Sequence, residues 1–332
     1  MVAKAAAKMK AEKQDERVEA YGQMLDFVGQ GKGDIEAIRV AKENALSKTK
    51  RVTGISLFQK LFDQNKGFKE GIEVARGLIN TKDPLMMKDG YHLLTSIVKL
   101  GRGFDAATAE YPSSSMDVVI LSRLNLLKEL VKQGQWYQAS KIGALSAMRS
   151  KNYKVQQSGF SLYAELIKKH QVFSASNRVP ELALASKYVE VRDQGYLLLA
   201  EFVRSDREIE QATKAALKGA EDEERVGTIV CLLSLYTQLL GKAKFSSDQT
   251  LSFAEKAFAK RKEKEIEAPL ISFLRKLVKE QGTSAQVKKM VEEFGRVDYS
   301  SKTQFNYLKQ EVGVRKGSTK GSASAFKKWA DK

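Results

Sequence analysis

Lysine and arginine recur at regular intervals along this sequence, and they are the side chains best suited to binding a ligand. Most of them fall at the predicted turn inside a pair of helices, and more follow near the C-terminal end. Cations in such a pattern are typical of a surface that contacts phosphate groups. We predict phosphate contacts by two sets of residues. The first set, the turn cations, is Lys48, Lys50, Arg51, Lys82, Lys88, Arg149, Lys151, Lys154, Lys187, Arg192, Lys260, Arg261 and Lys262. The second set, the tail lysines, is Lys327 and Lys328.

In a stack of helical pairs, equivalent turns lie along one ridge, with neighbours about 10 Å apart. The turn cations would then form a basic stripe, to which helix N-termini add backbone N–H donors. Two turns interrupt the stripe, because one carries Ser113–Ser115 and Asp117 and another carries the acidic run 221–224. The alternative is an ordinary solvated ridge, since lysine is common in exposed turns.

Two aromatic residues are candidates for stacking against nucleic-acid bases. Tyr153 lies in a basic turn, and Trp329 directly follows the two tail lysines. Other aromatics, such as Phe160 and Tyr163, have helical spacing and are predicted to be core residues.

Residues for catalysis or metal binding are scarce. The only histidines are His92 and His170 and the only cysteine is Cys231, too few for a Cys/His zinc site or a histidine-based triad. The segment 29–33 (GQGKG) lacks the Ser or Thr that follows the lysine of a phosphate-binding loop. We therefore predict no catalytic residue, no metal and no cofactor.

The composition predicts a folded protein with an anionic partner. The chain has 332 residues, 42% of them hydrophobic, and a net charge of +17. Such a charge attracts polyanions, although it could also serve solubility alone. No apolar run approaches the ~20 residues of a membrane helix, and a single cysteine suits a reducing compartment. We expect an intracellular protein, with the cytoplasm and the nucleoid or nucleus both open.

The elements that position these residues are helices arranged as a repeat. Apolar residues recur with the helical period, and segments 150–166 and 186–202 are identical at seven of seventeen positions. A glycine followed by apolar residues three and seven positions later recurs at Gly54, Gly90, Gly159 and Gly195. Because glycine weakens a helix, its repetition predicts close contact with another helix.

We predict an all-α protein, a right-handed α-solenoid of about seven helical hairpins. The predicted organisation is a basic N-terminal helix with a Gly-rich break over 1–33, the solenoid over 34–295, and a basic, flexible tail over 296–332.

The repeat resembles a known family. The run Val191–Phe202, with its Val-Arg pair, Gly195 and leucines, is similar to the second helix of a HEAT repeat, and Asp83–Met86 leading to Gly90 resembles the same motif. The resemblance covers about residues 35–280 and implies an α-solenoid, and the related armadillo type stays open.

The main functional prediction is non-enzymatic binding of DNA, RNA or a ribonucleoprotein through the turn cations and basic ends. The alternative is a protein-interaction scaffold, for an acidic partner, or a structural subunit of a larger assembly. A remote alternative comes from the HEAT-like alkylpurine DNA glycosylases, a family that uses tryptophans and a catalytic aspartate. Trp136, Trp329 and Asp193 would be the corresponding residue types here.

Overall fold

The chain is helical throughout the part that the structure describes. The computed structural model describes residues 1–9, 14–110, 113–169, 178–243, 245–294 and 302–313, and within these ranges it contains helices and no strand. The chain divides into two compact units, Met1–Ser176 and Asn177–Lys332, called unit 1 and unit 2. None of the described helices is long and apolar enough to cross a membrane.

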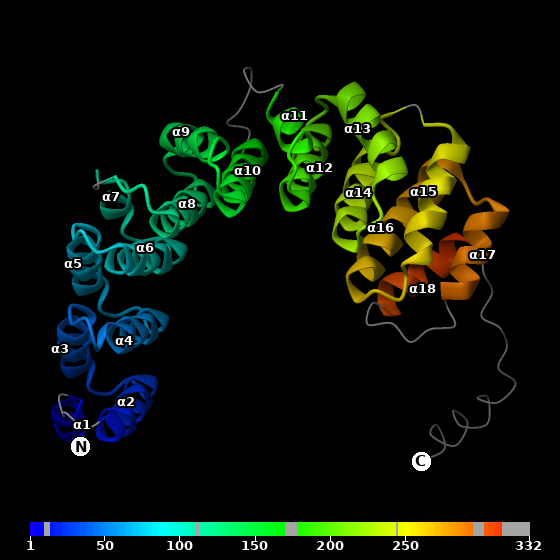
Figure 1. Cartoon of the computed structure of the whole chain (residues 1–332). Coiled ribbons are helices and arrows are strands. Elements are labelled where there is room, and N and C mark those ends of the chain that lie inside the picture. The colour runs from blue at the N-terminus through cyan, green and yellow to red at the C-terminus, as the bar shows by residue number, and fades with distance from the viewer. Residues whose placement is uncertain (10–13, 111–112, 170–177, 244, 295–301, 314–332) are drawn as a thin grey trace, which may run out of the picture. The chain divides into compact units, whose positions relative to one another are not determined.

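Unit 1 is a stack of helical hairpins, each with a first helix and a second helix (Figure 1). The first helices form one layer and the second helices form the other, and each second helix packs on the next along the stack. The helices are α1 (Val2–Lys8), α2 (Gln14–Gly29), α3 (Asp34–Ala45), α4 (Arg51–Asp63), α5 (Phe68–Ile79), α6 (Pro84–Lys99), α7 (Phe104–Ala107), α8 (Asp117–Lys132), α9 (Tyr137–Ala147) and α10 (Tyr153–Lys168).

Unit 2 repeats the same arrangement. Its second helices α12, α14 and α16 pack on one another in sequence. The helices are α11 (Val179–Leu184), α12 (Val189–Arg204), α13 (Ile209–Asp222), α14 (Val226–Leu239), α15 (Ser247–Ala259), α16 (Lys264–Gln281), α17 (Ala285–Phe294) and α18 (Lys302–Glu311). In the described residues, α3 to α16 make the seven predicted hairpins, so the all-α solenoid prediction is confirmed.

The repeated glycine lies where a second helix crosses its own first helix. A Cβ atom at Gly54 would lie 2.6 Å from the Ala41 carbonyl oxygen, and one at Gly90 would lie 2.7 Å from the Ala75 carbonyl oxygen. Both distances are too short for a carbon atom, so the neighbouring helix leaves no room for a side chain. The close contact that the sequence predicts is therefore present.

A second recurring feature, which the sequence interpretation missed, is the turn that enters five of the first helices, α3, α5, α7, α9 and α13. Two residues separated by one position have positive φ in this turn, where glycine costs least. The pairs are Gly31/Gly33, Asn65/Gly67, Gly101/Gly103, Gly134/Trp136 and Asp206/Glu208. The sequence signal for it was a glycine in one or both of these positions at four consecutive turns, about 34 residues apart. At Trp136 the left-handed conformation costs about 1–2 kcal/mol.

The two ends differ from the organisation read from the sequence. The N-terminal segment forms two helices, α1 and α2, which pack on α3 and α4 and extend the stack. Within the segment predicted as tail, α18 packs on α16 and buries Phe305 and Leu308. The period of these apolar residues fits a helix with one buried face, so regular packing continues past residue 296.

Candidate functional site

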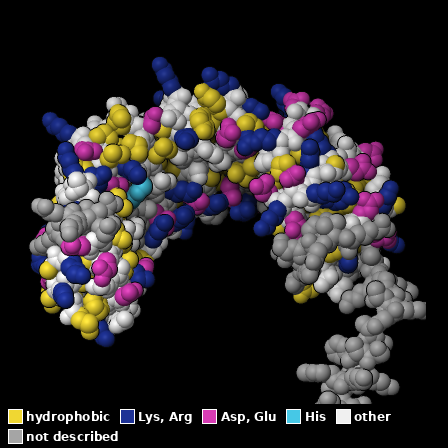
Figure 2. Space-filling view, turned by 60° about the horizontal axis from the view of Figure 1, so that its bottom comes forward, with side chains coloured by type: hydrophobic (Ala, Val, Ile, Leu, Met, Phe, Trp, Pro, Cys, Tyr) yellow, Lys and Arg dark blue, Asp and Glu magenta, His cyan; other side chains and the backbone are white. Residues whose placement is uncertain are grey.

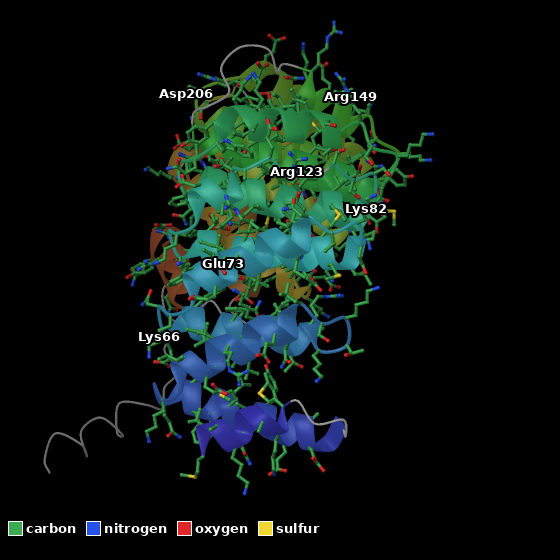
Figure 3. All side chains as sticks on the ribbon, turned by 90° about the vertical axis from the view of Figure 1, so that its left-hand side faces the viewer. Lys66, Glu73, Lys82, Arg123, Arg149 and Asp206 are labelled. Atoms are coloured by element: carbon green, nitrogen blue, oxygen red, sulfur yellow. The ribbon has the colours of Figure 1, made fainter. Side chains whose placement is uncertain are left out.

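The turn cations lie at the edge of each unit where the first helix leads into the second. In Figure 3, Lys82 and Arg149 lie on one edge of unit 1 and Lys66 lies on the opposite edge. Lys82 lies two residues before α6 and Arg149 lies two residues after α9, so both belong to turns inside a hairpin. The antiparallel pairing of the two helices in each hairpin places these turns together.

Most of the turn cations point to solvent. Seven are exposed: Lys48, Lys82, Arg149, Lys151, Lys154, Lys187 and Lys262; and three are partly exposed: Lys50, Lys88 and Lys260. Among the described residues, none of these ten side chains is in an ion pair with an acid. Figure 2 shows Lys and Arg spread over the visible surface with Asp and Glu among them, not gathered into one patch.

Three of the predicted cations, all arginines, instead connect successive hairpins. Each guanidinium lies against a carboxylate that belongs to the next hairpin along the chain. The pairs are Arg51–Asp89 (2.6 Å), Arg192–Glu223 (3.0 Å) and Arg261–Glu293 (3.7 Å). Only 12% of the Arg51 side chain is exposed. These arginines stabilise the stack and offer little of their charge to a ligand.

Of the two residues predicted to stack against bases, the structure describes Tyr153 but not Trp329. Tyr153 is partly exposed at the start of α10, with the Lys154 Nζ atom 6.0 Å from its ring centre. A neighbouring repeat has the same arrangement, with Lys187 Nζ 5.1 Å from the ring of Tyr188. Trp329, together with Lys327 and Lys328, lies outside the described residues.

A cleft that the sequence interpretation missed runs across the second helices of unit 1. This second-helix cleft has a volume of about 410 Å³. It crosses α4, α6 and α8, and its lining residues are Gln59, His92, Thr95, Ser96, Lys99, Asn125, Lys128, Glu129 and Lys132. Three lysines and one glutamate give it an excess of positive charge.

Lys128 is the most constrained cation of the second-helix cleft. Its Nζ atom donates a hydrogen bond to Ser161 Oγ on α10 at 2.7 Å. Burial lowers the pKa of the Lys128 ammonium below its usual range. The buried Glu129 accepts from Lys132 at 3.3 Å, so part of the charge is neutralised within the cleft.

A sequence signal for this cleft existed. A lysine occupies the last turn of every second helix from α4 to α10, namely Lys60, Lys99, Lys132 and Lys168. Such a lysine interacts favourably with the helix C-terminus. That local role explains each lysine singly, whereas the stacking of α6 on α8 brings Lys99 and Lys132 into one cleft.

Two of the residues considered for catalysis, Cys231 and Asp193, are buried inside the protein. Cys231 is buried in the core of unit 2, and burial raises the pKa of its thiol to about 12. Asp193 is buried and accepts a hydrogen bond from Thr228 Oγ1 at 2.7 Å. Burial raises the pKa of the Asp193 carboxyl. Among the described residues, no group of three or more His, Cys, Asp or Glu could hold a metal ion.

Comparison with known proteins identifies the fold. No known protein family and no curated protein matches the sequence. A solved structure of Kap95p, from a study of its binding to RanGDP, matches with a TM-score of 0.57 and 12% identity, over 99% of this chain and 49% of that chain. A Kap95:Nup1 complex matches with a TM-score of 0.51 and 9% identity, over 94% of this chain and 51% of that chain.

This chain thus spans about half the length of the solved structures that it matches. At these identities the similarity concerns the fold alone. Those structures are HEAT-repeat solenoids, and the all-helical hairpin stack of this chain agrees with them. The fold of this chain is a HEAT-like α-solenoid.

Proposed function

We propose that this protein is a non-enzymatic scaffold that binds an acidic segment of a protein partner in the second-helix cleft of unit 1. The observation that carries the proposal is the excess of lysine in that cleft, on a fold whose matched structures are complexes with proteins named Ran and Nup1. An intracellular, reducing location is part of the proposal, because it suits a single buried cysteine.

The cleft offers what an acidic peptide needs. Lys99 and Lys132 are exposed and lie on α6 and α8, which pack against each other. Between them, Asn125, Thr95 and Ser96 supply neutral hydrogen-bonding groups. A carboxylate near Lys128 would favour its charged form, which burial in the free protein disfavours. Charge-assisted hydrogen bonds are stronger than neutral ones.

The test compares two double variants with equal charge change. Lys99→Glu with Lys132→Glu reverses the cleft, and Lys82→Glu with Lys151→Glu reverses exposed turn cations as the control. Each purified chain is used to capture proteins from a nuclease-treated extract of the source cells. We expect one set of proteins to be retained by the wild type and the control but lost by the cleft variant. Equal retention by both variants would contradict the proposal.

A second candidate function, binding of DNA, RNA or a ribonucleoprotein, is favoured by one observation: the ten turn cations without an ion pair among the described residues. Fluorescence anisotropy with labelled single- and double-stranded DNA and RNA tests it. Binding through the turn cations should weaken steeply as salt is raised and should be lost in the Lys82→Glu, Lys151→Glu variant but kept in the cleft variant. The opposite pattern, or binding insensitive to salt, would exclude this candidate.

A further inference from the structure

The hairpin of unit 1 formed by α7 and α8, the third counted from α3, lacks most of its first helix. α7 has 4 residues, whereas the first helices on either side, α5 and α9, have 12 and 11. α7 packs on α6, at the near end of the gap. Among the described residues, the layer of first helices is therefore hollowed beside α8, between α7 and α9.

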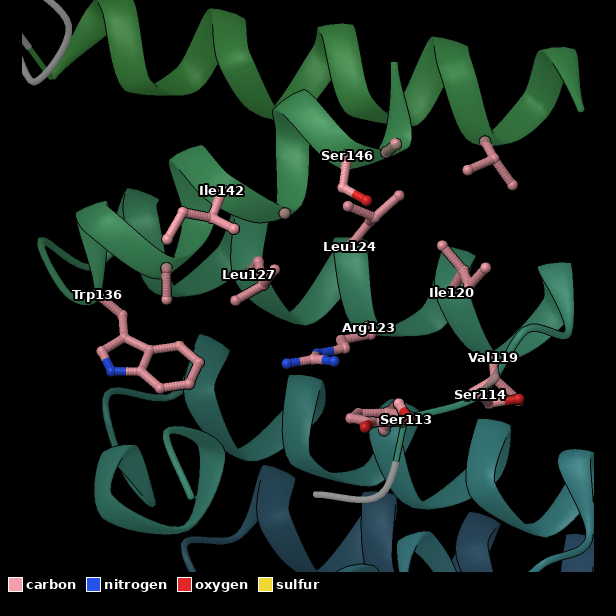
Figure 4. A pocket seen from close by; sticks show the side chains of 15 residues that line it. Ser113, Ser114, Val119, Ile120, Arg123, Leu124, Leu127, Trp136, Ile142 and Ser146 are labelled. Atoms are coloured by element: carbon pink, nitrogen blue, oxygen red, sulfur yellow. The ribbon is translucent and has the colours of Figure 1, made fainter. Parts of the chain in front are cut away.

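An apolar cleft of about 410 Å³ occupies this gap, which we call the first-helix cleft. Ile120, Leu124 and Leu127 of α8 form its floor, and Ile142 of α9 forms part of its wall (Figure 4). The Ile142 residue is 61% exposed, whereas Leu124 and Leu127 are each 4% exposed. The cleft is thus an apolar hollow into which side chains of a partner segment can insert.

The first-helix cleft and the second-helix cleft lie on opposite faces of α8. Successive residues of an α-helix are rotated by about 100°. Arg123 and Leu127 therefore lie on one side, and Asn125 and Lys132 lie on the other. A ligand in one cleft does not occupy the other.

Charge indicates which kind of segment would cover the first-helix cleft. Arg123 extends into it from α8 (Figure 4) and is exposed, and it has no ion pair among the described residues. Among the described residues that line the cleft there is no Asp or Glu. A segment with an apolar face and a carboxylate beside it would satisfy both the floor and Arg123.

Trp136 supplies an aromatic surface to the same cleft. Its backbone has φ of 55°, in a position of the recurring turn where three other repeats have Gly33, Gly67 and Gly103 and a fourth has Glu208. An aromatic residue is disfavoured in this conformation, yet its indole points into the cleft (Figure 4). An apolar side chain of a partner can pack against this ring.

We propose that the first-helix cleft binds an acidic amphipathic helix of a partner protein, which completes the layer of first helices at the third hairpin. The proposal extends the scaffold function to the opposite face of unit 1 and does not depend on the second-helix cleft. The partner helix places its apolar face on Leu124, Leu127 and Ile142, stacks against Trp136, and places a carboxylate at Arg123.

The experiment uses the full chain carrying Trp329→Phe, so that Trp136 is the only tryptophan. It is titrated with a synthetic peptide of 12 residues, the length of α5, which has leucines on one helical face and glutamates beside them. We expect a saturable shift of the Trp136 emission. A peptide with lysines in place of the glutamates should bind about tenfold more weakly or not at all.

Three variants locate the peptide. Arg123→Glu should weaken binding about tenfold, whereas Arg149→Glu, an equal charge change at an exposed turn, should leave it unchanged. Ile142→Glu should also weaken it. The double variant Lys99→Glu, Lys132→Glu should bind as the wild type does, which separates this proposal from the scaffold proposal. Circular dichroism establishes that each variant is folded.

Several results would overturn the proposal. They are an unchanged Trp136 emission at saturating peptide, equal affinity for the lysine peptide, and wild-type affinity of the Arg123→Glu variant. Light scattering tests a different occupant: a dimer that Ile142→Glu converts to a monomer would mean that a second copy of this chain covers the cleft.

Discussion

The two units use the same repeated cation in different ways. In unit 2, each arginine at a turn inside a hairpin has an acidic partner in an adjacent hairpin: Arg192 with Glu223, Arg225 with Glu190, and Arg261 with Glu293. In unit 1, Arg51 has such a partner, Asp89, whereas Arg149 and its neighbour Lys151 have none among the described residues. The role of a turn cation therefore depends on whether the next turn supplies an acid.

The acidic run 221–224 illustrates the point. In the sequence it interrupts the predicted basic stripe, and in the structure Glu223 binds Arg192 of the preceding hairpin through a 3.0 Å contact. A feature that weakens ligand binding at one turn thus strengthens stacking there. The units also differ at the helix crossings, because Gly54 faces backbone atoms of α3 whereas Gly195 faces the Leu184 side chain.

The crossing glycines give the largest expected difference between the units. A Cβ atom at position 54 would meet rigid backbone, 2.6 Å from the Ala41 carbonyl oxygen, whereas one at position 195 would lie 2.8 Å from the Leu184 Cγ atom, which can shift. We expect Gly54→Ala to destabilise unit 1 by about 3 kcal/mol and Gly195→Ala to destabilise unit 2 by about 1 kcal/mol. Hydrogen exchange of each unit, measured by mass spectrometry, reports these losses separately. Equal losses would remove the distinction.

The turn arginines give the next largest difference. Arg192→Ala leaves Glu223, a mostly buried carboxylate, without its guanidinium, and should destabilise unit 2 by about 1 kcal/mol. Arg149→Ala removes an exposed cation without an ion pair among the described residues and should change the stability of unit 1 by less than about 0.5 kcal/mol. Hydrogen exchange measured at increasing urea concentration gives the stability loss of each unit in each variant. A greater loss for Arg149→Ala would reverse our assignment of the two roles.

The smallest effect concerns the pH dependence of unit 2. Burial raises the pKa of the Asp193 carboxyl in the folded state, so the folded state retains its proton at a pH where the unfolded state has lost it. This group therefore lowers the stability of unit 2 as pH rises from the ordinary carboxyl pKa, about 3.9, through the raised value.

Asp193→Asn removes this pH-dependent term, because the amide does not ionise and its oxygen can still accept from Thr228. We expect the stability of unit 2, measured by hydrogen exchange between pH 4 and 7, to fall less with pH in the variant than in the wild type. Unit 1 provides the internal reference and should be unaffected. Identical pH profiles would mean that burial does not control the ionisation of Asp193.

Much of the fold follows from local information in the sequence. The helical period of the apolar residues, the recurring glycine at Gly54, Gly90, Gly159 and Gly195, and the cap at Asp83 with Pro84 each act within a few residues. They predict seven hairpins and the close crossing inside them. The shortness of α7 was not predicted, because the apolar pattern of α8 is the same whether or not a helix covers it.

The sequence alone determined the helices, the repeat and the number of cations, because these depend on spacing along one chain segment. The tertiary structure decided which cations remain available, because each arginine pair joins residues 31 to 38 positions apart. It also gathered Lys99, Lys128 and Lys132 of two neighbouring second helices into one cleft and formed the apolar hollow beside Arg123 among the described residues. Contacts between stacked hairpins determine these features, and no local spacing encodes them.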